Sequence, residues 1–421
     1  MDVPGAHTPR VSAARCAMAA SEQVPRAVGG GRYVIGQRLG AGGFGDVYGA
    51  RDMATRAPVA VKFEDCKTQQ LRKELRVLKQ FQGEVHSQGF ARILHMGRKG
   101  ELFYLVMECL GVSLEQRVQD CGGRLSVESA VLAAQQMLSC VELLHSTGFT
   151  HQDIKADNFM WGVAERRHHL YMIDFGLAER YWQAGAHVPD TQEERFRGTV
   201  FFAPLAAQQY RRQGRRDDLE ALAYTWLYLL SGSLPWMFVR AETDDVRFQQ
   251  VRDMKASRPI HDWFKGQPDA FQKFASHCDK LSYQDRPDYT LLHGFLSGLR
   301  ESFELKDHDF EWESRSSVGR QGLQPRAAVC QPDDDAPLWP GSGLKRARSA
   351  SPRHPECPVC CGGTSWTTAA AGAYAKGWWC DGRGCLQGSA TGEAGRFACG
   401  TCARDFCAGC AGVPRPLSAG A

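Results

Sequence analysis

The alternation of apolar and polar residues predicts a small β-sheet early in the chain. Residues 33–39, 59–63 and 102–107 are short runs rich in Val, Tyr, Phe and Leu, which is typical of strands. Between the second and third runs, leucines recur at helical spacing among Lys, Arg and Glu over residues 71–80. This pattern predicts one amphipathic helix that packs beside the sheet.

Farther along, the apolar residues recur mostly at helical spacing. Ser126 can cap a long apolar-periodic helix over residues 127–145. A second helix, over residues 218–230, is apolar on all sides and is therefore expected at the centre of a core. The longest apolar stretch, residues 221–230, is well short of the roughly 20 residues that a membrane span needs. We therefore expect no membrane-spanning segment.

Shifts in composition divide the chain into five parts. Residues 1–31 are rich in Ala, Arg, Gly and Pro and are expected to form a disordered arm, with a transit peptide as the alternative. Residues 32–305 have the dense apolar pattern of a globular domain. Residues 306–355 are polar and rich in Pro, Ser and Arg, as expected of a disordered linker. A cysteine-rich module follows over residues 356–412, and residues 413–421 form a tail.

The charges of the chain nearly balance. There are 51 Lys and Arg against 47 Asp and Glu, a net charge of +4, so no nucleic-acid or membrane-surface partner is indicated. Nine of the 16 cysteines lie within residues 357–410, which argues against a disulfide framework throughout the chain. The basic run Lys345–Arg348 is either a nuclear import signal or an ordinary surface run. We expect a monomer in the cytoplasm, the nucleus or both.

A glycine-rich run introduces the first candidate chemistry. Residues 40–47, GAGGFGDV, match a G-x-G-x-x-G-x-V pattern that dinucleotide-binding and protein-kinase sites share. A dinucleotide site needs a helix directly after the glycines, whereas residues 47–49 are strand-like and Pro58 blocks a helix. We therefore expect a hairpin turn whose backbone N–H groups approach phosphate oxygens, although an ordinary glycine hairpin also fits the motif taken alone. The spaced glycines are Gly40, Gly42 and Gly45.

A lysine and a glutamate form the next candidate pair. Lys62 ends the run VAVK on the second predicted strand, where a lysine is expected to bridge the α- and β-phosphates and to need a carboxylate partner. Glu74 lies on the predicted helix over residues 71–80. An ion pair between Lys62 and Glu74 would fix this helix against the sheet. Either residue alone would be interpreted as a solvated surface residue.

The third group of residues carries the chemistry of phosphoryl transfer. Residues 151–158 read HQDIKADN, and Asp174 opens a DFG run sixteen residues after Asn158. Asp153 can accept the proton of an attacking hydroxyl, and Lys155 can neutralise the γ-phosphoryl oxygens. Asn158 and Asp174 offer hard oxygen ligands to Mg²⁺. The ordered set favours an active phosphotransferase, and the alternative is a catalytically weak or inactive nucleotide-binding scaffold.

These motifs resemble the protein kinase superfamily over about residues 33–305, and finer features resemble its casein kinase I branch. The matching runs are LGAGGFGDVY (39–48), VMECLGVSLE (106–115), HQDIKADNFMWG (151–162), IDFGLAERY (173–181), FRGTVFFAP (196–204), RRDDLEALAY (215–224) and SLPW (233–236). The resemblance implies an α+β, two-lobed fold, with a β-rich N-lobe over about residues 32–108 and a helical C-lobe over about 109–305. It also implies ATP and Mg²⁺ in the cleft and transfer of the γ-phosphate to Ser or Thr hydroxyls of protein substrates.

The resemblance further assigns the adenine end of the cleft. Met107 would be the gatekeeper, and Glu108 to Leu110 would form the hinge that holds adenine. Asp218 would brace the catalytic loop from the central helix. Five further residues either line the adenine slot or are ordinary core: Val47, Ala60, Phe159, Met160 and Ile173.

Three departures from the family pattern affect regulation and substrate choice. Gln152 replaces the usual Arg that in many kinases pairs with a phosphorylated activation loop, so switching by such a phosphate is not expected. Residues 198–204, GTVFFAP, lack the Arg associated with pre-phosphorylated substrates, and a usually basic stretch reads TDDVR at residues 243–247. A preference for phospho-primed or acidic substrates is therefore not implied. Four arginines offer a different basic surface or are simply solvated: Arg211, Arg212, Arg215 and Arg216.

The cysteine-rich module contains four closely spaced pairs. They are Cys357 with Cys360, Cys380 with Cys385, Cys399 with Cys402, and Cys407 with Cys410. Eight thiolates are enough for about two tetrahedral zinc ions, and a segment so poor in apolar residues would need metal to fold. The module resembles ZZ-type cross-braced zinc fingers, which implies that alternate pairs share an ion and that the finger binds a protein partner. Sequential pairing, a RING-like role, a disulfide-rich tail and a metal-free disordered tail remain as alternatives.

Overall fold

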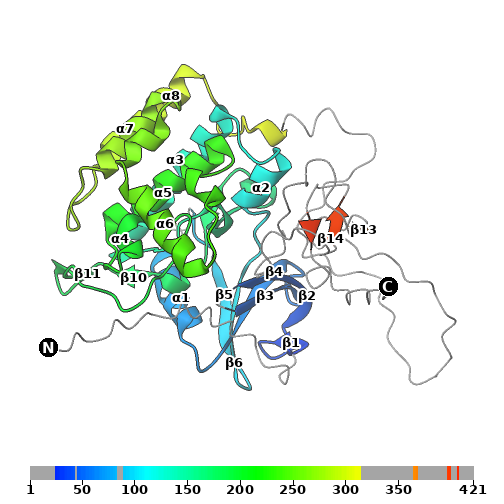
Figure 1. The fold of residues 1–421 in the computed structure, drawn as a ribbon. Helices are drawn as coiled ribbons and strands as arrows, with labels where there is room; N and C mark the ends of the chain where they lie inside the picture. The colour runs from blue at the N-terminus through cyan, green and yellow to red at the C-terminus, as the bar shows by residue number, and fades with distance from the viewer. Residues whose placement is uncertain are drawn as a thin grey trace, which may run out of the picture. The chain divides into compact units, whose positions relative to one another are not determined.

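The computed structural model divides into two compact units, residues 1–335 and 336–421, and each is described by itself. In the first unit a β-rich part is followed by a helical part (Figure 1). The residues that the structure describes are 24–42, 45–82, 89–313, 364–367, 396–399 and 405–406.

The β-rich part is a sheet of six strands in the order β1-β2-β3-β4-β6-β5, with every neighbouring pair antiparallel. Its strands are β1 (Ala27–Val28), β2 (Tyr33–Gly42), β3 (Gly45–Asp52), β4 (Pro58–Asp65), β5 (Ile93–Lys99) and β6 (Leu102–Glu108). Strands β2, β4 and β6 confirm the three predicted runs. Pro58 is tolerated because it is the first residue of β4. Alternation along β4 buries Val59, Val61 and Phe63 on one face, which places Lys62 on the other.

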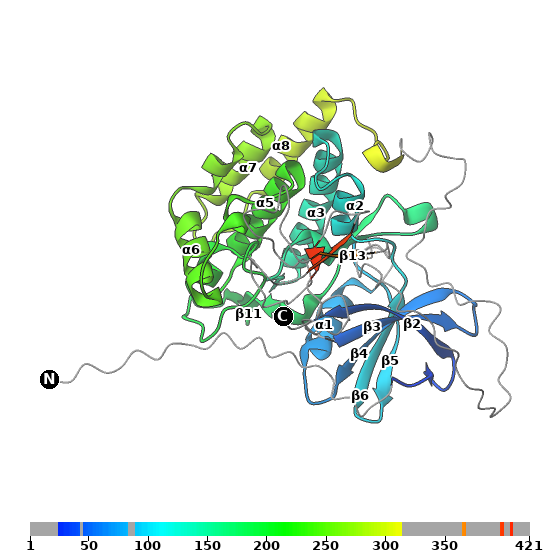
Figure 2. The same ribbon diagram turned by 45° about the vertical axis from the view of Figure 1, so that its right-hand side comes forward.

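The predicted amphipathic helix is α1 (Gln70–Leu78), which lies beside the sheet in both ribbon views (Figures 1 and 2). Its buried face includes Leu71, Leu75 and Leu78. The carboxylate of Glu64 on β4 accepts hydrogen bonds from the backbone N–H groups of Gln70 and Leu71, each at 3.0 Å. These bonds satisfy the free donors at the start of the helix and fix α1 to the strand that carries Lys62.

The helical part is built around α5. Its helices are α2 (Leu114–Asp120), α3 (Val127–Ser146), α4 (Leu205–Gln208), α5 (Arg215–Ser231), α6 (Asp244–Ala256), α7 (Asp269–Cys278) and α8 (Tyr289–Ser302). Ser126 caps α3 as predicted, because its hydroxyl accepts from the Ser129 N–H at 3.2 Å. The central position predicted for α5 is confirmed, since it packs against α3 and α7 and is buried along nearly its whole length.

Short elements connect these helices. Two-stranded pairings join β7 (Phe149–Thr150) to β10 (Glu179–Arg180), β8 (Phe159–Trp161) to β9 (Leu170–Met172), and β11 (Trp182–Gln183) to β12 (Ala186–His187). Short 3₁₀ turns occupy Lys79–Phe81, Ala156–Asn158, Ala164–Arg166, Phe175–Leu177, Pro235–Phe238 and Ile260–Phe264. Helix α3 is long and apolar enough to cross a membrane by length and composition alone, and 61% of its most apolar window is buried inside the helical part.

Secondary structure and buried side chains extend beyond both predicted boundaries of the globular domain. Strand β1 lies within the predicted N-terminal arm, pairs with β2 and buries Val28. At the other end, Phe310 and Trp312 are buried where a linker was predicted to begin at residue 306. Their rings pack on Trp161 with centroid distances of 4.8 and 5.4 Å. Two aromatic side chains anchor this segment because each buries a large apolar area, although its sequence shows no periodicity.

The second unit contains an antiparallel sheet in the order β13-β14-β15. These strands are β13 (Thr364–Thr367), β14 (Arg396–Cys399) and β15 (Asp405–Phe406). Cys399 is the last residue of β14, and the other predicted zinc ligands lie outside the described residues. Three of the described cysteines of the first unit are free thiols: Cys66, Cys140 and Cys278.

Candidate functional site

A glycine-rich hairpin joins β2 to β3. Gly42 pairs with Gly45 across it, and residues 43–44 lie outside the described part of the chain. Gly45 has φ +127°, and a Cβ atom there would lie 2.2 Å from the carbonyl oxygen of Phe63, so only glycine fits. Because strand β3 and not a helix follows the glycines, the hairpin prediction is confirmed and the dinucleotide-binding alternative is wrong.

A cavity of about 260 Å³ lies between this hairpin and the helical part. Its walls are mainly apolar, with a few charged groups at one end, which suits a ligand with a planar ring and a charged tail. The residues predicted to bind the cofactor that line it are Gly40, Gly45, Val47, Ala60, Lys62, Met107, Glu108, Leu110, Met160 and Ile173. Gly42 lies on the hairpin, where it pairs with Gly45.

Three charged side chains meet at the polar end of the cavity. Lys62 Nζ donates to Glu74 Oε2 at 2.6 Å and to Asp174 Oδ1 at 3.2 Å. Lys62 is 6% exposed and Glu74 is 3% exposed. The predicted ion pair between strand and helix is therefore present, and it extends to the DFG run 112 residues away from Lys62.

Burial and charge oppose each other in this cluster. Burial disfavours the charge on Lys62, but the carboxylates of Asp174 and Glu74 outweigh it and raise the pKa of Lys62. Burial also opposes the charge on Asp174, and Lys62 outweighs it, so the pKa of Asp174 is lowered. For Glu74 burial dominates over Lys62 and raises the pKa. The cluster therefore keeps a fixed cation and at least one fixed anion facing the cavity.

Asp153 lies at the centre of a second set of contacts. Its Oδ1 accepts from Thr199 Oγ1 at 2.7 Å, and its Oδ2 lies 3.0 Å from Lys155 Nζ. Lys155 Nζ also donates to Thr199 Oγ1 at 2.8 Å, which closes a triangle of polar atoms. Asn158 Nδ2 donates to the Asp153 carbonyl at 2.7 Å and fixes the loop from within. Asp153 thus presents an oriented carboxylate beside an ammonium group.

A buried carboxylate on α5 holds the Asp153 loop. Asp218 is 1% exposed and accepts from the backbone N–H of His151 at 2.7 Å and from that of Gln152 at 2.9 Å. Its Oδ2 also lies 2.8 Å from His145 Nε2. The bracing role implied for Asp218 is borne out by these contacts. They hold Gln152 at φ +67°, a left-handed conformation that costs about 1–3 kcal/mol for a non-glycine residue.

Asn158 and Asp174 both line the cavity near Lys62, so the residues proposed as Mg²⁺ ligands face the same space. No cluster of three or more His, Cys, Asp or Glu able to hold a metal occurs in the described residues. Mg²⁺ is usually bound by one or two carboxylates together with substrate phosphates and water. An amide oxygen beside one carboxylate therefore fits Mg²⁺ brought with a nucleotide.

Sequence reasoning left one residue open and missed others. Phe159 does not line the cavity, because its ring is fully buried in the main core. Six further wall residues were not named as site residues: Leu39, Leu78, Ala91, Cys109, Met172 and Phe175. Three of them lie within recognised runs, Leu39 directly before the glycines, Cys109 in the predicted hinge and Phe175 in the DFG run. Leu78, Ala91 and Met172 lie in none of these runs. Thr199 was also missed as a partner of Asp153.

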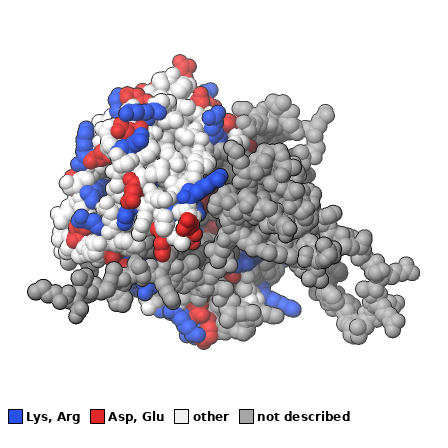
Figure 3. Space-filling view, viewed as in Figure 1, with Lys and Arg blue, Asp and Glu red and all other residues white. Residues whose placement is uncertain are grey.

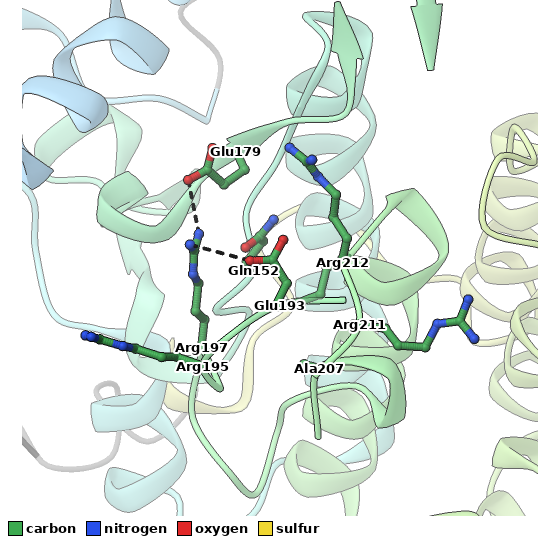
Figure 4. A pocket seen from close by; sticks show the side chains of 9 residues that line it. Gln152, Glu179, Glu193, Arg195, Arg197, Ala207, Arg211 and Arg212 are labelled. Atoms are coloured by element: carbon green, nitrogen blue, oxygen red, sulfur yellow. Dashed lines mark hydrogen bonds and ion pairs between the residues drawn. The ribbon is translucent and has the colours of Figure 1, made fainter. Parts of the chain in front are cut away.

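The four arginines proposed as a basic surface do not form one patch. Arg215 is buried, and its guanidinium stacks on the ring of Tyr181 at 4.6 Å from the centroid. Arg211 pairs with Asp190 and, with Arg212, borders a second cavity of about 270 Å³, where the two side chains point in different directions (Figure 4). On the face drawn in Figure 3, basic and acidic side chains are interspersed, in keeping with the small net charge.

A comparison with models of protein families gives an independent finding. The model described as "Protein kinase domain" matches residues 33–294, which is more than half of the chain. The match begins at β2 and ends within α8, and it includes the hairpin, the cavity and the Asp153 loop.

Proposed function

The chain belongs to the protein kinase family, and from this premise we propose that it is a Ser/Thr kinase of the casein kinase I type. Family membership implies that the protein uses ATP and Mg²⁺ and acts on protein substrates. The observation that carries the proposal is a pair of contact sets that Asn158 connects. Lys62 meets Glu74 and Asp174 on the cavity wall, which Asn158 also lines. Asn158 Nδ2 donates to Asp153 Oδ2 at 3.2 Å, and Asp153 pairs with Lys155.

The proposed reaction needs one proton acceptor and several positioned charges. Asp153 takes the proton of the substrate hydroxyl as that oxygen forms its bond to the γ-phosphorus. The bond between the γ-phosphorus and the bridging oxygen breaks, and its electron pair leaves with ADP. Lys62 orients the α- and β-phosphates, and Lys155 neutralises charge on the transferred group. Mg²⁺, held by Asn158 and Asp174, would supply further charge neutralisation.

The casein kinase I assignment is supported by how its branch-specific runs are used in the structure. The run RRDDLE begins α5 and provides Asp218, which holds the catalytic loop. In the SLPW run, Trp236 Nε1 donates to the Phe201 carbonyl at 2.7 Å, which fixes the segment next to Thr199. Phe201 also stacks against Arg247. We also propose that substrates without a prior phosphate are accepted, because residues 198–204 lack the Arg associated with pre-phosphorylated substrates.

The test is phosphoryl transfer from labelled ATP with Mg²⁺ to casein and to unbiased peptide mixtures. We expect label on Ser and Thr, and loss of nearly all label with Asp174→Asn. Transfer no greater than that of the Asp174→Asn control would refute the enzymatic proposal and favour the scaffold alternative. Label confined to Tyr would refute the Ser/Thr assignment, and strict dependence on primed peptides would refute the substrate assignment.

We also propose that the cysteine-rich module is a zinc finger that recruits a protein partner. The support is the spacing of the four cysteine pairs in the sequence. Elemental analysis of the full chain should give about two zinc ions, and Cys399→Ser with Cys402→Ser should remove about one. Zinc-free protein with unchanged circular dichroism and proteolysis pattern would contradict the proposal.

A further inference from the structure

A single carboxylate joins helix α1 to the segment that leads to the catalytic triangle. Glu179 Oε1 accepts from Lys73 Nζ at 2.7 Å and from Arg197 at 3.1 Å. Arg197 also lies 3.6 Å from Glu193 Oε2, and Figure 4 shows its guanidinium between the two carboxylates. We infer that Glu179 is a positioning residue that holds both sides of the site in the catalytic arrangement.

The two partners of Glu179 are each close in sequence to a residue of the site. Lys73 directly precedes Glu74, the partner of Lys62. Arg197 is two residues before Thr199, whose hydroxyl donates to Asp153. A shift of either partner therefore moves a group that contacts a reacting centre. The carboxylate of Glu179 therefore connects the cluster around Lys62 with the proton acceptor Asp153, although it contacts both only through neighbouring residues.

The backbone at Glu179 is itself fixed to the catalytic loop. It lies on β10, where Glu179 pairs with Thr150 of β7, and Thr150 Oγ1 donates to the Glu179 carbonyl at 3.3 Å. Thr150 directly precedes His151, where the loop held by Asp218 begins. Glu179 is thus anchored through its main chain while its side chain holds the two neighbouring segments.

The charges around Glu179 bear on whether this segment depends on a phosphate, and the cavity is also bordered by Arg195 and Arg212. Gln152, which borders the same cavity, is neutral and cannot pair with a phosphorylated segment. Arg197 already has two carboxylate partners, and Arg211 is paired with Asp190. The carboxylate of Glu179 therefore supplies, as a permanent part of the chain, the negative charge that phosphorylation adds in a switched kinase. This inference rests on the proposed kinase function.

The test is a double-mutant cycle on phosphatase-treated, full-length protein. Glu179→Gln keeps the shape of the side chain and removes its charge. Because half-exposed ion pairs are individually weak, we expect kcat to fall about five- to tenfold and not to vanish. Glu179→Asp should recover part of the loss. Lys73→Met should lower kcat in the wild-type background but add little in Glu179→Gln, since the pair is already broken.

Two further measurements distinguish positioning from general stability. Hydrogen exchange should become faster at residues 70–78 and 193–199 in Glu179→Gln, while residues 215–231 and the unfolding midpoint stay unchanged. Glu101→Gln, which removes an exposed ion pair with Arg98, is the matched control and should leave kcat and exchange unaltered. Wild-type kcat in Glu179→Gln, additive effects in the cycle, or unchanged exchange at residues 70–78 would overturn the inference. If the wild type shows no phosphoryl transfer, the proposed function fails. The hydrogen-exchange measurement on Glu179→Gln then still tests whether Glu179 holds residues 70–78 and 193–199 in place.

Discussion

The two halves of the site are held in place by different forces. On the helical side, Asp153 belongs to a loop fixed by Asp218, a fully enclosed carboxylate that accepts two backbone N–H groups. On the sheet side, Lys62 pairs with the buried Glu74 of α1, and the outer contact of α1 is the ion pair of Lys73 with Glu179, whose side chains are about one third exposed. The helical half is thus held by fully buried hydrogen bonds, whereas the sheet half also depends on an ion pair that is open to solvent. We expect mutations to separate accordingly into losses of stability and losses of activity.

The largest effect should come from removing the support on the helical side. Asp218→Ala leaves the N–H groups of His151 and Gln152 buried without an acceptor, and we expect a loss of about 3–5 kcal/mol in the free energy of unfolding. Urea unfolding of the full chain, followed by tryptophan fluorescence, measures it. Asp253→Ala, at an exposed aspartate of α6, is the control. A loss below about 1 kcal/mol would contradict the assignment of this loop to the folding core.

The corresponding change on the sheet side should affect activity instead. Lys62→Met removes the cation that holds Glu74 and Asp174, so we expect kcat to fall about a hundredfold or more. The unfolding midpoint should change less than in Asp218→Ala, because Asp174 lines the cavity and is partly exposed, so water can replace part of its contact with Lys62. Steady-state kinetics and thermal unfolding of the same preparation decide the outcome. Equal losses of stability in Lys62→Met and Asp218→Ala would remove the distinction between the two halves.

A smaller effect, opposite in sign, is expected at the neighbouring aspartate of α5. Asp217 is fully buried, and burial raises its pKa to about 7 from a usual value of 3.8. The folded state therefore binds more protons than the unfolded state between these values, so stability falls as the pH rises from about 4 to 7. Asp217→Asn can still accept from the Gly214 N–H and should raise stability at pH 8 by about 2 kcal/mol. Urea unfolding at pH 5 and pH 8 tests this, and an unchanged pH dependence would contradict it.

Some residues of the site could be predicted from the sequence because short local patterns specify them. Gly45 is required by a positive φ and a close carbonyl, and such positions favour glycine strongly enough to appear as a motif. Lys62 and Asp153 are recognisable because their spacing is set by the strand and the loop that carry them. The length and central position of the helix around Asp218 also followed from its uniformly apolar pattern. In each case the signal lies within a few neighbouring residues.

Contacts between segments far apart in the sequence could not be predicted in this way. Glu179 binds Lys73 across 106 residues, yet this glutamate has the appearance of an ordinary surface residue in the sequence. The burial of Phe310 against Trp161 likewise extends the domain beyond its predicted end. The reason is physical. The backbone conformation of a turn and the burial of one face of a helix or strand each restrict residues that are close in sequence, so they leave a local pattern. The partner of a charged or aromatic side chain, in contrast, is decided only when packing brings remote segments together.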